Sequence, residues 1–209
     1  MSRFFDISPP VTENTAVFPG DVPFARTVHQ AWTPGSHMEL SSVQSTLHIG
    51  AHVDAPSHFH PDGDPIGRLP PEIFVGPCRV MDLRGHGPRR ILPEHVQATG
   101  SPVDQPRILL RTDTFPDPMT WRDDFASLSP ELVSWLASQN VGLIGIDTPS
   151  VDPADSKELE AHKALARTGI INMEGILLTA VDPGLYQLSC LPLNLTTCEA
   201  SPVRAVLWK

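Results

Sequence analysis

Histidine and aspartate side chains gather in one short segment, LHIGAHVDAPSHFH, at residues 47–60. The segment contains four of the nine histidines of the chain and one aspartate: His48, His52, Asp54, His58 and His60. Imidazole nitrogens and carboxylate oxygens are ligands that suit Zn²⁺, Mn²⁺ and Fe²⁺. An imidazole can also exchange a proton near neutral pH. The residue types therefore predict metal-dependent or acid–base chemistry in this segment.

Two local geometries compete for residues 46–55. His48 and His52 have the i, i+4 spacing of a helical metal site, but Gly50 lies between them and Pro56 follows. The odd-numbered positions from 47 to 55 are apolar, whereas the even-numbered ones are polar or small. Such alternation is typical of an extended chain and would place His48, His52 and Asp54 on one face. The alternative is a polar strand face that only contacts water.

Three protein ligands would leave open positions on a metal ion, which favours a catalytic site over a structural one. His58 follows the turn-prone Pro56, and it could be a further ligand or a general acid and base. His60 precedes the turn signal Pro61-Asp62-Gly63 and is interpreted as an exposed loop histidine.

A second source of ligands lies far along the chain. His162 falls within an expected helix, where a single histidine is usually only solvated or packed. Glu174 stands between apolar runs in GIINMEGILL, so its carboxylate is expected to be buried and to need a partner such as a metal ion. Together with the first cluster, these two residues would suffice for two metal ions.

Asp147 is the main competing acid, because it ends a buried strand where α/β proteins often place functional groups. The favoured interpretation is that its side chain caps the turn at Thr148-Pro149.

The elements that must position these residues indicate a mixed α/β domain. Apolar runs predict strands at 79–83, 107–111, 141–146, 175–181, 188–193 and 203–208. Helix signals predict helices from Pro93 to before Gly100, from Ser129 to about Gln139 and from about Ser156 to Arg167. In the third helix, Asp155 and Glu158 have the spacing of a capping box, and Gly169 suits the exit.

Composition narrows the class of protein. The chain has 209 residues, of which 40% are hydrophobic, which suits a single domain over residues 1–209. A net charge of −9 without a basic run disfavours nucleic-acid binding. We see neither a signal peptide nor a membrane span, and the three cysteines form no metal or disulfide pattern, so we expect a soluble cytoplasmic protein.

The segment HIGAHVDAPSHF resembles the His-x-Gly-Thr-His-x-Asp-x-Pro-x-His-Phe motif of the cyclase-like metal hydrolases, with Ala51 where threonine is usual. Further stretches, among them VFPGD, GIDTPSVDP and INMEGI, resemble the bacterial kynurenine formamidase branch of that family. The resemblance spans essentially the whole chain. It implies a single α/β domain with a β-barrel-like mixed sheet and flanking helices, assembled as a homodimer.

The resemblance also implies roles for individual residues. His48, His52 and Asp54 correspond to ligands of a first Zn²⁺, and Asp54, His162 and Glu174 to ligands of a second, with Mn²⁺ as an alternative ion. His58 corresponds to the proton donor and acceptor, and Phe18 to an aromatic residue that contacts substrate.

The implied reaction is hydrolysis of N-formyl-L-kynurenine to L-kynurenine and formate in tryptophan degradation. In it, a metal-activated hydroxide attacks the formyl carbon and His58 protonates the departing aryl amine. The alternatives are a related hydrolase acting on a cyclic amide or another aryl formamide, and a non-catalytic metal-binding protein.

Overall fold

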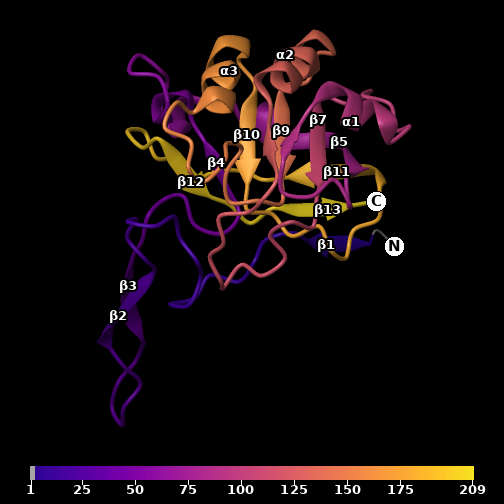
Figure 1. The fold of residues 1–209 in the computed structure, drawn as a ribbon. Coiled ribbons are helices and arrows are strands. Elements are labelled where there is room, and N and C mark those ends of the chain that lie inside the picture. The colour runs from indigo at the N-terminus through magenta and orange to yellow at the C-terminus, as the bar shows by residue number, and fades with distance from the viewer. Residues whose placement is uncertain (1–2) are drawn as a thin grey trace.

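A computed structural model describes residues 3–209, and Met1 and Ser2 of the predicted domain lie outside the described residues. Its centre is one nine-stranded mixed sheet, which curls so that β1, β11 and β13 cross below the central strands (Figure 1). The strands follow the order β1 (Phe4–Asp6), β13 (Val206–Trp208), β11 (Gly184–Ser189), β5 (Val75–Asp82), β7 (Arg107–Arg111), β9 (Leu143–Ile146), β10 (Ile171–Glu174), β4 (His52–Asp54) and β12 (Ala200–Pro202). The predicted α/β class with a barrel-like mixed sheet is confirmed.

The four central strands, β5, β7, β9 and β10, are parallel, and the strands on both sides of them pair antiparallel. Every residue of β7 and β9 is buried, as expected for parallel strands covered on both faces. Alternate residues enter two separate cores. Ile108 and Leu110 pack beneath the helices, whereas Leu109 points into the core enclosed by the curled sheet.

In the part of the chain that the structure describes, three α-helices cover one face of the sheet: α1 (Pro93–Ala98), α2 (Pro130–Ser138) and α3 (Glu160–Thr168) (Figure 1). The predictions of α1 and α2 are confirmed. Ser129 caps α2 by accepting a hydrogen bond from the backbone N–H of Leu132, and Pro130 occupies the first turn.

Helix α3 begins later than predicted, at Glu160, and the predicted capping box of Asp155 and Glu158 is wrong. Leu159 has a left-handed backbone, with φ of 48°, which cannot continue a helix. The helix N-terminus is instead capped from a distance, because the carboxylate of Asp152 accepts the N–H groups of Ala161 and His162. The helix exit at Gly169, with φ of 73°, agrees with the prediction.

Strand boundaries show where apolar runs mislead. The prediction of a strand at 175–181 is wrong, since β10 ends at Glu174 and Gly175 turns with φ of 64°. Three of the apolar side chains that follow, Ile176, Leu178 and Val181, are buried in the core without joining the sheet. The run at 188–193 contributes only the end of β11, and the run at 203–208 contributes only β13.

Two smaller sheets complete the fold. β6 (Arg90–Ile91) pairs with β8 (Ser127–Leu128). β2 (Ala25–Gln30) and β3 (Leu40–Gln44) form a hairpin that projects away from the body of the protein (Figure 1), and every residue of both strands is exposed. Short 3₁₀ turns lie at Pro56–His58, Ile66–Arg68 and Pro71–Phe74. Within residues 3–209, no helix has both the length and the apolar character needed to cross a membrane.

Candidate active site

The candidate site is built on two adjacent strands, β4 and β10. These strands are antiparallel, and their register places His52 opposite Glu174. Asp54 lies two residues after His52 and so projects from the same face of β4. All three side chains are buried, with residue exposures of 2%, 1% and 3% for His52, Asp54 and Glu174. Three ionisable groups are therefore held together away from bulk water.

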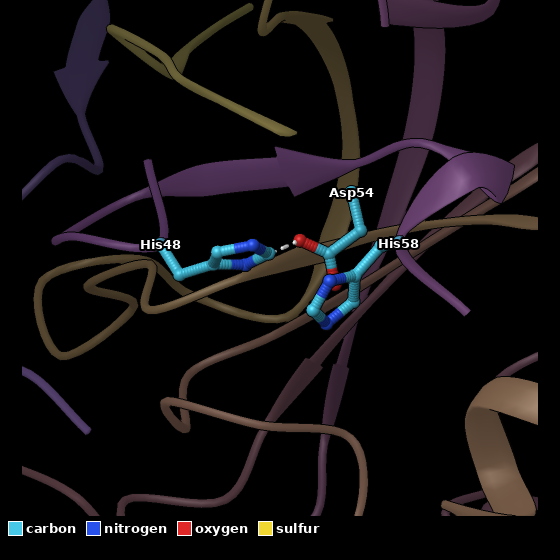
Figure 2. A group of neighbouring side chains, drawn as sticks. All are labelled: His48, Asp54 and His58. Carbon is cyan, nitrogen blue, oxygen red and sulfur yellow. Dashed lines mark ion pairs between the residues drawn. The ribbon is translucent and has the colours of Figure 1, made fainter. Parts of the chain in front are cut away.

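His48 reaches the cluster by a different route from the predicted one. The expected strand over residues 46–55 is wrong, because only His52–Asp54 form β4 and the chain bends from Leu47 to Ala51. Gly50 adopts φ of 57° in this bend. The carbonyl group of Gly50 lies so close to Gly175 that a Cβ atom at position 175 would collide with it. The bend brings Nδ1 of His48 to 3.0 Å from Oδ1 of Asp54 (Figure 2).

His162 enters the cluster from α3. Its Nε2 lies 3.5 Å from Oδ2 of Asp54 and 3.5 Å from Oε1 of Glu174. Its Nδ1 lies 2.8 Å from a carboxylate oxygen of Asp152, and Nδ1 of His52 lies 3.0 Å from the carbonyl oxygen of Gly50. In both histidines Nδ1 is the donor, so Nε2 faces the carboxylates and, in the neutral form of the ring, offers its lone pair to a cation.

Asn172 joins the two buried acids. Its side-chain amide donates hydrogen bonds of 2.7 Å to Asp54 and 2.9 Å to Glu174. Oε1 of Glu174 also accepts the backbone N–H of Val151 at 2.9 Å. These donors fix the orientation of both carboxylates while leaving their other oxygen atoms toward the histidines.

The electrostatics of the cluster follow from its mixture of buried bases and acids. Burial alone would lower the pKa of His52, but Glu174 and Asp54 outweigh it and raise that pKa to about 9. Burial also opposes protonation of His162, yet the surrounding carboxylates raise its pKa well above the usual value. Burial would raise the pKa of Asp54, but His162 and His48 hold it well below its usual range. The imidazoles of His52 and His162 are therefore protonated and positively charged near pH 7 in the metal-free cluster.

The unsatisfied atoms of the cluster fit a divalent cation. Within residues 3–209, Nε2 of His52 and Oδ1 of Asp54 are both buried, and neither has a partner with hydrogen-bond geometry. Two groups have ligand atoms within 4.8 Å of one another: His48, Asp54 and His58, and His52, Asp54 and Glu174. Nitrogen and carboxylate ligands in such sets suit Zn²⁺ and Mn²⁺. Asp54 belongs to both groups, as expected for a bridging carboxylate.

His58 lies in the 3₁₀ turn after β4, beside the cluster (Figure 2). Its ring centroid is 4.2 Å from that of His48 and 5.6 Å from that of His162. Partial burial lowers its pKa below the usual value, so its imidazole is neutral near pH 7. In this position it could coordinate a cation or transfer a proton.

A cavity of about 540 Å³ opens onto the cluster. Its walls include four of the ligand candidates (His48, His52, His162 and Glu174), His58, and the aromatic side chains of Phe18, Phe115 and Trp121. The rings of Phe18 and Trp121 meet edge to face with centroids 5.0 Å apart. The size suits a small organic molecule with an aromatic group.

His60 and Asp147 have other surroundings. His60 is exposed, and its Nδ1 accepts the backbone N–H of Asp62 at 3.2 Å. Asp147 borders the cavity, but its carboxylate accepts three hydrogen bonds from Thr112 and Asp113. The predicted cap of the Thr148-Pro149 turn is therefore wrong, since Asp147 caps a turn at the end of the neighbouring strand β7.

Sequence reasoning missed Asn172, Asp152 and Trp121. Asn172 had a usable signal, because it precedes Glu174 by two residues and so shares its face of the strand. Asp152 acts across a loop, and Trp121 lies in a segment without regular structure, so neither had a local periodic signal.

Known proteins share this sequence and fold. A model of the Cyclase family matches residues 5–153. The kynurenine formamidases of Bordetella pertussis and Bordetella avium are 45% and 44% identical to this chain over 207 residues, which cover 99% of this chain and 98% of each relative.

Solved structures agree in fold over nearly the whole chain. One, described as a potential metal-dependent hydrolase with cyclase activity, has a TM-score of 0.87 and 24% identity, covering 100% of this chain and 98% of the other. Isatin hydrolase A from Labrenzia aggregata has a TM-score of 0.82 and 21% identity, covering 99% and 93%. At these identities the two structures establish a shared fold. The family model and the full-length relatives establish more: the chain belongs to the cyclase family.

Proposed function

We propose that this chain is a metal-dependent kynurenine formamidase, which hydrolyses N-formyl-L-kynurenine to L-kynurenine and formate. The observation that carries the proposal is a buried histidine–carboxylate cluster at the base of an aromatic-walled cavity. It occurs in a chain 45% identical to a kynurenine formamidase over nearly its full length. The cluster supplies the means of hydrolysis, and the cavity supplies room for an aryl formamide.

The ligands that we assign are His48, His52 and Asp54 for one cation, and Asp54, His162 and Glu174 for a second. The unpartnered Nε2 of His52 and Oδ1 of Asp54 support this assignment. We propose Zn²⁺ as the resident ion, and Mn²⁺ suits the same ligands. When bound, such an ion lowers the pKa of water and polarises a carbonyl group.

The remaining chemistry falls to the side chains of the chain. Water adds to the formyl carbon, and the bond between that carbon and the aryl nitrogen then breaks. The departing nitrogen needs a proton, because an anilide anion is a poor leaving group. His58 is neutral near pH 7 and lies beside the cluster, so it takes a proton from the attacking water and returns one to this nitrogen.

The aromatic wall holds the ring of the substrate. Phe18 and Trp121 meet edge to face and border the cavity, with Phe115 behind Trp121. Packing of the substrate ring on this wall would point its formamide group toward the cluster.

The function is tested by measuring formate release from N-formyl-L-kynurenine alongside metal analysis of the same sample. Dialysis against a chelator should abolish turnover, and added Zn²⁺ or Mn²⁺ should restore it. Full activity after exhaustive metal removal, or hydrolysis of a cyclic amide in preference to the formamide, would contradict the proposal.

His58 has a matched control in His60, which is exposed and outside the cluster. His58→Ala should retain bound metal and lose about 10²- to 10⁴-fold in kcat, as expected for loss of a general acid and base. His60→Ala should leave both unchanged. Loss of metal from His58→Ala would make His58 a ligand instead.

We also propose that the protein is cytoplasmic and that it forms a homodimer. The β2–β3 hairpin supports the homodimer. A two-stranded hairpin in water is marginally stable by itself. Here it exposes Val28 and Val43, together with Trp32 and Met38 beyond the strands. Light scattering should report a dimer, and Val28→Ser combined with Val43→Ser should shift it toward a monomer. A monomeric wild-type protein would exclude the dimer.

A further inference from the structure

The cavity carries one cationic side chain of fixed charge. Among the described residues that line it, Lys157 is the one Lys or Arg. Four acidic residues also line it: Asp21, Asp147, Glu174 and Glu199. Glu174 belongs to the histidine cluster, and the carboxylate of Asp147 is occupied by Thr112 and Asp113. The outer lining therefore presents Lys157 and two further acids. Asp21 accepts one hydrogen bond, from the hydroxyl of Thr46, and Glu199 lies 3.7 Å from Nε2 of His48. Both acids keep their charge on the cavity wall, and this pattern of charges matches a zwitterion.

Lys157 lies in the loop between β9 and α3, and its neighbours Ser156 and Leu159 also line the cavity. The hydroxyl of Ser156 accepts the N–H of Leu159 at 3.1 Å, and Leu159 holds a left-handed backbone. Non-glycine residues adopt this conformation at a cost, and such residues often occur at functional sites. The loop then leads into α3, which carries His162. The path of the loop therefore fixes the position of Lys157 relative to the histidine cluster.

The ammonium group of Lys157 forms no ion pair with another residue in the range 3–209, and the side chain is exposed. Lys163, in the first turns of α3, differs in this respect, because it pairs with Glu158 at 3.0 Å. It also lies outside this cavity. The two lysines thus form a natural pair for comparison, one facing the cavity and one not.

We propose that Lys157 binds the α-carboxylate of the substrate and selects aryl formamides that carry an amino-acid side chain. The inference rests on the proposed function. With the formamide at the cluster and the ring on the aromatic wall, the amino-acid end must extend into the remainder of the cavity. There Lys157 offers the cation for the carboxylate, while Asp21 and Glu199 favour the ammonium group.

The experiment compares two substrates that share the reacting group. N-formyl-L-kynurenine has the amino-acid end, and 2-formamidoacetophenone lacks it. Lys157→Met should raise KM for N-formyl-L-kynurenine by about 10- to 100-fold, because it removes one charge-assisted hydrogen bond to the substrate, and kcat should change little. It should leave both constants for 2-formamidoacetophenone unchanged. Lys157→Arg should restore part of the loss, and Lys163→Met should behave as wild type.

Two results would overturn the assignment while leaving the proposed function intact. One is an unchanged KM in Lys157→Met. The other is an equal rise in KM for both substrates, which would indicate a structural role for the loop. If the wild-type protein hydrolyses neither substrate, the proposed function itself fails and the role of Lys157 fails with it.

Discussion

His52 and Glu174 are direct cross-strand partners, and Nε2 of His52 lies 3.3 Å from Oε2 of Glu174. A base and an acid are thus held opposite each other by backbone register, at residue exposures of 2% and 3%. Because the sheet fixes both side chains before any ion arrives, the cluster is preorganised, and its behaviour can be predicted from the groups around it.

Metal affinity should increase with pH. The pKa of His52 is raised to about 9 and that of His162 is also raised, so both hold protons at pH 7. Coordination requires their neutral forms, so binding must release these protons. The apparent affinity for Zn²⁺ should therefore rise by about 10- to 100-fold per pH unit near pH 7, as measured by competition with a chromophoric chelator. A pH-independent affinity would contradict the protonated state of the cluster.

The same protons stabilise the metal-free fold. The pKa values of His52 and His162 are higher in the folded state than in the unfolded state. Their contribution to the free energy of unfolding is therefore fully present below about pH 6.5, the unfolded pKa of histidine. For His52 it is lost as the pH rises through about 9. The free energy of unfolding of chelator-treated protein should fall over this range, which urea titrations at several pH values would measure.

Asn172→Leu should weaken metal binding more than it disturbs the fold. The substitution removes the amide that donates to both Asp54 and Glu174. Loss of a residue that orients metal ligands typically costs about 10- to 100-fold in affinity. Chelator competition would measure this, with Gln187→Leu on an exposed position of β11 as the control. Unchanged affinity would show that the carboxylates need no bridging donor.

Asp152 should be separable into two roles. In Asp152→Asn the side-chain oxygen can take the place of Oδ1, beside Arg90, and still accept the N–H of Ala161. The amide nitrogen then takes the place of Oδ2, where it faces the backbone N–H and Nδ1 of His162 and favours the wrong tautomer. Asp152→Ala loses the helix cap as well, at a further cost of about 1 kcal/mol in unfolding free energy.

Both Asp152 variants should bind metal less tightly, and the alanine variant should lose more stability because it also loses the acceptor for the N–H of Ala161. Histidine ¹⁵N chemical shifts would report the tautomer of His162 directly. An unaltered tautomer in Asp152→Asn would contradict this role.

Gly175→Ala should destabilise the protein and lower its metal affinity. Its φ of 64° is unfavourable for alanine, and the new Cβ would collide with the carbonyl of Gly50 in the bend that carries His48. Gly169→Ala is the matched control, because its φ is 73° but, apart from its chain neighbours, no residue in the range 3–209 has an atom within 4 Å of the added Cβ. The control should lose about 1 kcal/mol of unfolding free energy and keep its metal affinity. Equal effects of the two variants would exclude a displaced bend.

Trp121→Ala should lower kcat/KM for N-formyl-L-kynurenine by about 10-fold, the worth of one aromatic contact. Trp32→Ala removes an exposed ring from the hairpin region, distant in sequence and outside the cavity, and should leave kcat/KM unchanged. If both variants resembled wild type, the aromatic wall would not bind the substrate ring.

The sequence predicted the parts of this protein that depend on local patterns. The positions of α1 and α2, the buried central strands and the shared face of His52 and Asp54 all follow from patterns within a few residues. Glu174 was also recognised, because an acid between apolar runs requires a partner.

The parts that could not be predicted depend on contacts between distant segments. Asp152 caps α3 and orients His162 from across a loop, so no capping motif stands beside the helix. The bend at Gly50 depends on its close approach to Gly175. The apolar run after Glu174 is buried as a strand would be, and burial alone does not distinguish an extended strand from a packed loop.

The position of β4 in the sheet has a consequence for maturation. This strand lies between β10 and β12, so its neighbours are residues 171–174 and 200–202. During synthesis, the segment bearing His52 and Asp54 must wait for most of the chain before either neighbour can pair with it. The ion-binding centre is therefore among the last features to form, and loading with metal belongs after translation rather than during it.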